Sequence, residues 1–373
     1  MPNPLSDVLQ ALQALGAQVD FLPATGGAVE DLDLPDIDER VDNWLNYQER
    51  IFESIIESPS TGLYRRVEPI GRTVQHTFRY FLDGSLRSYF LGTAIEEDRD
   101  TPVHFAQLGA ALVRRLDDGN VKVRRLEVEK ALFLAKNRLS QVAWDGVARA
   151  CQKVGIQIED ISQDDQITKH LSGQADLRNR TAGKVRYRMH MLETKIALAG
   201  LNELKDEEWL VVDGSLLFEI LLSQLCQRES PRVIGVAKSF RRDPQFKVGK
   251  GVRAQRLNLT QLLAELKDCH RTAAFGARDG RVVFWYVRIR PQGAMDYPLM
   301  GVIKVEMANP SQGPVDTELV DFLSGCLVAE RSVTPYGADR RWHACLYPIY
   351  LAEQAIKTSF LSDEVVRSGL RWR

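Results

Sequence analysis

The chain has 373 residues, of which 44% are hydrophobic, 27% charged and 8% aromatic. This is an ordinary globular composition, so it excludes wholesale disorder, collagen and coiled coil. The length predicts one large domain with insertions, or two domains. We expect neither a membrane span nor a secretory signal. No apolar run approaches the roughly 18 residues of a transmembrane helix, and no basic segment followed by an apolar one opens the chain.

The cysteines indicate where the protein resides. Five of them are scattered without a CxxC pair, namely Cys151, Cys226, Cys269, Cys326 and Cys345. An odd and scattered set argues against a disulfide framework and a zinc knuckle. We therefore expect a reducing compartment and a cytoplasmic protein.

The net charge of -1 hides an uneven distribution of charged residues. Acidic residues dominate residues 30–57, whereas bases dominate residues 178–188 and 238–256. Two basic zones are the pattern expected of a protein that binds a polyanion such as nucleic acid. Solvated helix faces and loops would explain these zones equally well.

The N-terminal part, residues 1–65, is expected to form a helical arm. Within residues 42–56, Trp44, Tyr47, Ile51 and Ile55 recur at helical spacing. Pro59 and Gly62 then interrupt the pattern. We favour packing of this arm on the domain's own core over packing on a neighbouring molecule.

Residues 66–373 are expected to form the main domain. Residues 76–95 read as two strands around an Asp-Gly-Ser turn at Asp83, and a third strand begins at Val103. Residues 124–200 look helical, with a helical insert at about 124–175. A strand ending at Asp213, a helix and a strand ending at Lys238 suggest a parallel βαβ unit. Strands at 282–290 and 301–307 and two C-terminal helical segments complete an α/β fold, a mixed sheet with helices on both faces.

Four carboxylates stand out by their setting. Asp83 and Asp213 lie at predicted strand ends, where α/β sheets commonly place their sites. Glu193 interrupts the apolar stripe of a predicted helix, and Glu353 lies on the last long helix. Such a set suits Mn²⁺ or Mg²⁺, and two such ions can hydrolyse a phosphodiester. Each residue also has an ordinary explanation: a turn for the aspartates, and a solvent-reaching or surface position for the glutamates.

Basic residues beside these carboxylates would hold the phosphate backbone. Arg180, Lys184 and Arg188 form one positive stripe on the helix that carries Glu193, and Arg241 and Arg242 belong to the second basic zone. Lys238 could contact the scissile phosphate, or be a plain strand-end lysine. The sequence contains no HxxxH or HExxH spacing, no phosphate-binding GxxxxGK[ST] loop and no GxSxG motif, which disfavours a zinc hydrolase, a P-loop ATPase and a serine hydrolase.

Seven segments resemble the NurA nuclease family in the same order. They read FRYFLDGSLR, MLETKIALAGL, EEWLVVDGSLL, RVIGVAKSF, VVFWYVRIR, GVIKVEM and CLYPIYLAEQA, and the resemblance spans roughly residues 77–359. The resemblance implies a ribonuclease-H-like fold. It also implies an Mn²⁺-dependent DNA nuclease with single-strand endonuclease and 5′–3′ exonuclease activity. Such proteins form homodimers and process DNA ends with the hexameric ATPase HerA.

The resemblance also assigns roles to individual residues. Asp83 matches the first-strand aspartate, Glu193 the helix glutamate, Asp213 the later strand aspartate and Lys238 the lysine after the VIGV-type strand. At Glu353 the family commonly has a histidine or an aspartate. This departure motivates an alternative, a catalytically weak or inactive DNA-binding subunit of an ATPase–nuclease complex. An actin-like or sugar-kinase-like ATPase ranks last, because the glycines do not cluster into two phosphate-cradling loops and the two halves of the chain do not match.

Overall fold

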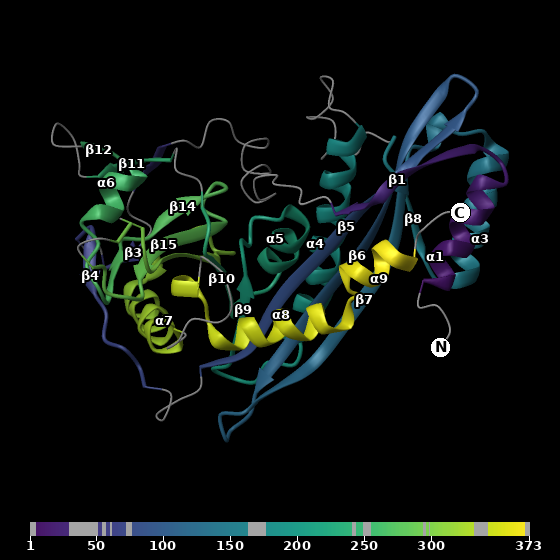
Figure 1. The fold of residues 1–373 in the computed structure, drawn as a ribbon. Coiled ribbons are helices and arrows are strands. Elements are labelled where there is room, and N and C mark those ends of the chain that lie inside the picture. The colour runs from purple at the N-terminus through teal and green to yellow at the C-terminus, as the bar shows by residue number, and fades with distance from the viewer. Residues whose placement is uncertain are drawn as a thin grey trace.

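A computed structural model describes most of the chain: residues 5–29, 51–53, 57–59, 62–71, 77–162, 177–240, 244–248, 255–293, 296–297, 299–331 and 342–369. The main element is a twelve-stranded mixed sheet with helices against both faces (Figure 1). The expected α/β class is therefore confirmed. The path through the sheet is β4-β13-β15-β16-β10-β9-β5-β6-β7-β8, with β1 beside β5 and β14 beside β15.

The strands of this sheet differ greatly in length. The long ones are β5 (Phe78–Glu96), β6 (Arg99–Arg115), β7 (Val121–Leu134) and β1 (Asp20–Val29). The shorter ones are β4 (Tyr64–Arg66), β8 (Gln157–Asp160), β9 (Trp209–Asp213), β10 (Val233–Ala237), β13 (His270–Thr272), β14 (Phe275–Ala277), β15 (Val282–Arg288) and β16 (Val302–Ala308). Small sheets pair β12 (Gln255–Asn258), β11 (Gln245–Val248) and β2 (Ile51–Glu53), and β17 (Val315–Asp316) with β3 (Glu57–Ser58).

The two faces of the sheet build two separate cores, because neighbouring residues of a strand point to opposite faces. Leu82 and Val212 pack with the helices α4 (Leu177–Leu201), α5 (Glu219–Cys226) and α6 (Leu259–Ala264). Phe81 and Val211 pack on the other face with α7 (Thr317–Glu330) and α8 (Tyr347–Ser359). A third core joins α1 (Ser6–Gly16) and α3 (Gln141–Val154) to the far ends of β5 and β6, and α9 (Asp363–Gly369) adds Val366 to it. No helix in the described ranges is long and apolar enough to cross a membrane.

The turn predicted at Asp83-Gly84 is wrong. β5 runs straight through both residues, and the chain reverses at Glu97–Asp98, where Glu97 has a φ of 58°. Asp83 pairs with Ala111 of β6 in a ladder that extends from Tyr80 to Glu96, with one irregularity. Asp-Gly favours a turn locally, but this pairing with β6 outweighs that preference.

The helical insert predicted at about 124–175 is also wrong in its first part. Residues 124–134 belong to β7, which pairs antiparallel with β6 from Val121 to Phe133. In the described part of this segment the α-helix is α3, which follows the N-cap Ser140 and ends before Gly155 in the left-handed conformation. The spacing of the apolar residues in 124–134 is compatible with either a helix or a strand. The long apolar strand β6 is available for pairing, and this pairing favours the strand. Residues 163–176 lie outside the described residues.

The N-terminal arm is helical only at α1 among the described residues of 1–65. β1 pairs with β5, β4 pairs with β13, and β2 runs parallel to β11. Of the helix predicted over 42–56, residues 51–53 form β2, and the rest lie outside the described residues. The arm contributes strands because exposed edges of neighbouring sheets are available to pair with it.

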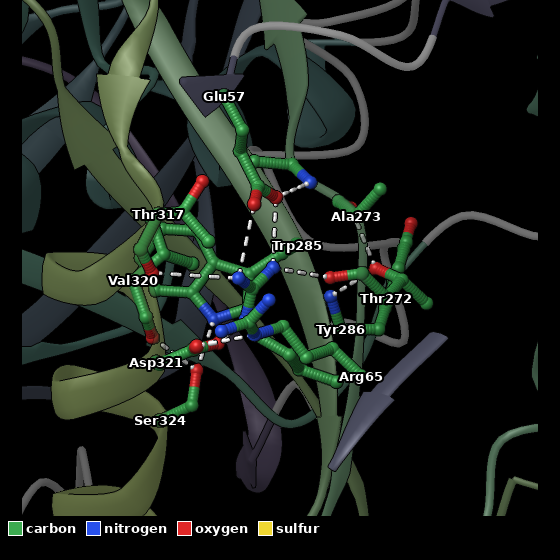
Figure 2. Close-up of polar contacts among 12 residues, drawn as sticks. Glu57, Arg65, Thr272, Ala273, Trp285, Tyr286, Thr317, Val320, Asp321 and Ser324 are labelled. Carbon is green, nitrogen blue, oxygen red and sulfur yellow. Dashed lines mark hydrogen bonds and ion pairs between the residues drawn. The ribbon is translucent and has the colours of Figure 1, made fainter. Parts of the chain in front are cut away.

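A buried polar network fixes one part of this segment to the domain. Figure 2 shows Glu57 and Asp321 on either side of this network, and Arg271 bridges them. Arg271 donates to both oxygens of Glu57 at 2.7 and 2.9 Å and to Asp321 Oδ1 at 2.6 Å. Arg271 is 0% exposed and Glu57 5%, so the ion pair that joins β3 to β13 is shielded from water, whereas the Asp321 side chain on α7 is 23% exposed.

Candidate functional site

The candidate site lies where β5 leaves its neighbour β9. β9 pairs with β5 through Leu82, and β1 pairs with β5 only from Tyr89 onward. Between these points the described residues place no strand on that edge of β5. Because β5, β9 and β10 are parallel, Asp83, Asp213 and Lys238 all emerge at this opening.

The other four residues singled out in the sequence lie close enough to Asp83 for their charges to act on it. Asp83 is only 6% exposed. Burial raises the pKa of Asp83 well above its usual value, and the negative charge of Asp213 raises it further. Lys238 opposes this rise in pKa, whereas Glu353 and Glu193 add to it. The site therefore concentrates negative charge that Lys238 alone does not balance.

Lys238 directly contacts one of these carboxylates. Its Nζ lies 2.9 Å from Oδ2 of Asp213. Burial by itself would lower the pKa of Lys238, but the charges of Asp213 and Asp83 outweigh it and raise that pKa above its ordinary value. Lys238 is thus a cation at neutral pH and cannot serve there as a general base.

Glu193 reaches the site from α4 on the other face of the sheet. It is buried, and its Oε2 lies 2.7 Å from Nδ1 of His190, one turn earlier on the helix. Its carboxylate rests against the backbone of β5 at Gly84, where the missing side chain leaves room for it. The sequence arguments missed His190, although its i−3 spacing from Glu193 puts both on one helix face.

Gly84→Ala is expected to destabilise the protein by about 1–3 kcal/mol, because a methyl group there would lie 2.2 Å from Glu193 Oε1. Chemical denaturation measures the effect. The matched control is Gly146→Ala in α3, where the nearest atom to the new methyl is 3.8 Å away. The control should be stabilising by about 0.5–1 kcal/mol through helix propensity. Equal effects of the two substitutions would contradict the packing of Glu193 on Gly84.

Glu353 approaches from α8, which packs across β5 and β6 (Figure 1). Its Oε1 lies 2.5 Å from Nζ of Lys357, one turn later on the same helix. The negative charge of Glu353 raises the pKa of Asp83, so Glu353 lies near that residue. Its carboxylate already has a cationic partner in Lys357.

The predicted nucleic-acid contacts are placed only in part. Arg180, Lys184 and Arg188 lie on α4 as expected and are half-buried. Arg188 forms ion pairs with Glu129 at 3.2 Å and Glu159 at 2.9 Å. Arg241 and Arg242 lie outside the described residues.

The donor chemistry of the site fits a hard divalent cation, since carboxylate oxygens are the ligands that Mn²⁺ and Mg²⁺ prefer. The present side-chain arrangement does not form a ligand cage. No three acidic, histidine or cysteine side chains within the described residues are disposed to hold one metal ion. Lys238, His190 and Lys357 instead contact Asp213, Glu193 and Glu353.

A groove of about 710 Å³ lies at the opposite ends of β9, β10 and β16. Trp209, at the start of β9, lines it together with Arg232 and Met307. None of the five predicted site residues does so. The carboxylate opening and the groove are therefore separate features, and only the opening gathers the predicted chemistry.

No protein-family model matches this chain, and no curated protein matches it as a relative.

Proposed function

We propose that the protein is a metal-dependent DNA nuclease with a ribonuclease-H-like fold, of the NurA type that its sequence resembles. The observation that supports this most strongly is one opening of the sheet at which Asp83, Asp213 and Lys238 emerge from neighbouring parallel strands, with Glu193 and Glu353 near enough for their charges to act on Asp83. They come from two strands, the end of a third and two helices, and are up to 270 positions apart, from Asp83 to Glu353. Burying repelling carboxylates costs free energy, and such strain commonly marks functional sites.

In this proposal each residue has a defined task. Asp83, Glu193, Asp213 and Glu353 would hold Mn²⁺ or Mg²⁺. A bound ion of this kind supplies an activated water for attack on phosphorus and offsets charge on the leaving oxygen. Lys238, kept protonated by its acidic neighbours, would neutralise negative charge that develops on the phosphate.

The substrate and partners follow from the same proposal. Arg180, Lys184 and Arg188 on α4, with Arg241 and Arg242, would contact the DNA backbone at single strands or ends. The protein would act in the cytoplasm as a homodimer in DNA end processing, together with a HerA-type hexameric ATPase. The position of α4 supports the first part, because the helix that carries the basic stripe also carries Glu193.

End-labelled single- and double-stranded DNA, incubated with the full chain with and without Mn²⁺, tests the proposal. Cleavage should require Mn²⁺, and Asp213→Ala should reduce its rate by about 100-fold or more. Asp98→Ala, at the exposed tip of the β5–β6 hairpin, is the matched control and should cleave like wild type. Mn²⁺-dependent cleavage that survives Asp213→Ala would remove this site from the reaction.

A second candidate is a catalytically weak or inactive DNA-binding subunit of an ATPase–nuclease complex. It is favoured by the cationic or imidazole partners that three of the four carboxylates already have. In this case DNA would bind without being cut under any metal condition, whereas the nuclease proposal requires cleavage.

A further inference from the structure

A fifth buried carboxylate, Glu306, contacts the turn that carries Asp213. Glu306 lies on β16, two strands away from β9 in the sheet, and is 1% exposed. Its Oε2 accepts hydrogen bonds from Ser215 Oγ at 2.6 Å and from the Leu216 backbone N–H at 2.8 Å. Its other oxygen, Oε1, lies 2.6 Å from Nζ of Lys304.

In the strand between Glu306 and this turn, the residue opposite Glu306 has no side chain. The register pairs Glu306 with Gly235 of β10, which separates β16 from β9. A methyl group on Gly235 would lie 2.7 Å from the Gly214 carbonyl oxygen and 3.0 Å from Leu216 Cγ. Gly235 thus allows both the side chain of Glu306 to cross β10 and the turn to pack against that strand.

The turn is held at several atoms that lie within two residues of Asp213. Gly214 N–H donates to the Val236 carbonyl at 3.0 Å, and Ser215 Oγ accepts from Leu217 N–H at 3.1 Å. Glu306 is the charged member of this set, and charge-assisted hydrogen bonds are the stronger ones. Fixing residues 214–216 fixes the direction in which Asp213 leaves β9 and hence its contact with Lys238.

We propose that Glu306 is a positioning residue: through Ser215 and Leu216 it holds Asp213 in the orientation that the site requires. This inference rests on the proposed nuclease function for its catalytic consequence. It also gives a reason for the Asp-Gly-Ser sequence at 213–215. The aspartate belongs to the candidate site, and the serine hydroxyl donates a hydrogen bond to the buried Glu306.

Three variants of the full chain test this proposal. Glu306→Ala removes all contacts with the turn. Glu306→Gln keeps an acceptor oxygen for Ser215 and Leu216 but loses the charge that pairs with Lys304. Glu330→Gln is the matched control. Like Glu306, Glu330 is buried and paired with a cation, in this case Arg115, but it lies beside the start of β5, away from the turn.

Amide hydrogen exchange of the metal-free protein measures how firmly the turn is held, and it does not require the protein to be active. Glu306→Ala should speed exchange of the 214–217 amides by about tenfold or more relative to the amides of β9 and β10. Glu306→Gln should largely restore their protection, and Glu330→Gln should leave it intact. Unchanged exchange at 214–217 in Glu306→Ala would overturn the proposal.

Kinetics then test the link to the reaction. Glu306→Ala should lower kcat for Mn²⁺-dependent cleavage by about 10- to 100-fold, as outer partners of metal ligands do, with KM for DNA changed little. Glu306→Gln should recover most of this loss. A kcat that falls equally in Glu330→Gln, or not at all in Glu306→Ala, would overturn the role in the reaction. Absence of cleavage by wild type would refute the nuclease function instead, and hydrogen exchange would still decide whether Glu306 positions the turn.

Discussion

Asp83→Asn is expected to be more stable than the wild-type protein in metal-free buffer near pH 7, and to cleave no DNA. The substitution keeps the size of the side chain and removes a buried charge that faces three other carboxylates. We expect a gain of roughly 1–2 kcal/mol in the free energy of unfolding, the range found where stabilising substitutions sacrifice function. Thermal and urea unfolding in the presence of a chelator measure it.

The stability difference should depend on pH with a definite sign. The folded protein binds the proton of Asp83 more tightly than the unfolded chain does, because burial and Asp213 raise its pKa. The free energy of unfolding of wild type therefore falls, relative to Asp83→Asn, as the pH rises from the ordinary value of 3.8 through the raised one. Well below pH 3.8 the two proteins carry no charge at this position and should be equally stable.

Mn²⁺ should reverse this order. An ion that binds the folded protein raises the Tm of wild type by mass action, and the effect should be lost in Asp83→Asn. Asp98→Asn, on the exposed hairpin tip, should change neither the stability nor the response to Mn²⁺. If the Asp83→Asn protein is less stable than wild type in the presence of a chelator, the contacts of Asp83 stabilise the fold, and its burial is not a cost that a functional site imposes.

The parts of the fold that could be predicted are those in which the local sequence pattern is compatible with only one type of secondary structure. The apolar runs of β9 and β10, separated by the short α5, gave the parallel βαβ unit, because strands buried on both faces lack polar alternation. Asp213 and Lys238 follow directly from it as strand-end residues. Asp83 shows the opposite case. Its Asp-Gly dipeptide indicates a turn, and only the long ladder with β6 keeps the strand straight.

Residues that meet through tertiary contacts could not be placed from the sequence. Glu306 lies within an apolar strand, so its burial could be inferred from the sequence. Its contact with Ser215 could not, because that contact depends on Gly235 lying between them. The ion pairs of Arg188 with Glu129 and Glu159 likewise join α4 to β7 and β8, neither of which the helical interpretation of residues 124–175 contained. Spacing locates a residue on its own element, whereas register and packing decide what it contacts.

Glu57→Gln is expected to destabilise the protein by about 3–5 kcal/mol, the cost of breaking a buried ion pair by removing one partner. The amide cannot match both parallel hydrogen bonds from Arg271, whose guanidinium has no exposed surface. It also weakens the acceptor at Oε1, which binds the Ala274 backbone N–H at 2.5 Å. Because β3 and β13 meet through this pair, the loss should appear as a lower urea midpoint of the whole domain.

Arg65→Met provides the matched control on the same network. Arg65 contacts the Asp321 carboxylate that also binds Arg271, but its side chain is 42% exposed. Removing it should cost no more than about 1 kcal/mol, as for surface ion pairs in general. A double variant, Glu57→Gln with Arg271→Met, should be less destabilised than the sum of the single changes, because neither charge is then left alone. Additive effects in this cycle, or a loss in Glu57→Gln no larger than in Arg65→Met, would mean that the buried network does not hold the N-terminal segment to the domain.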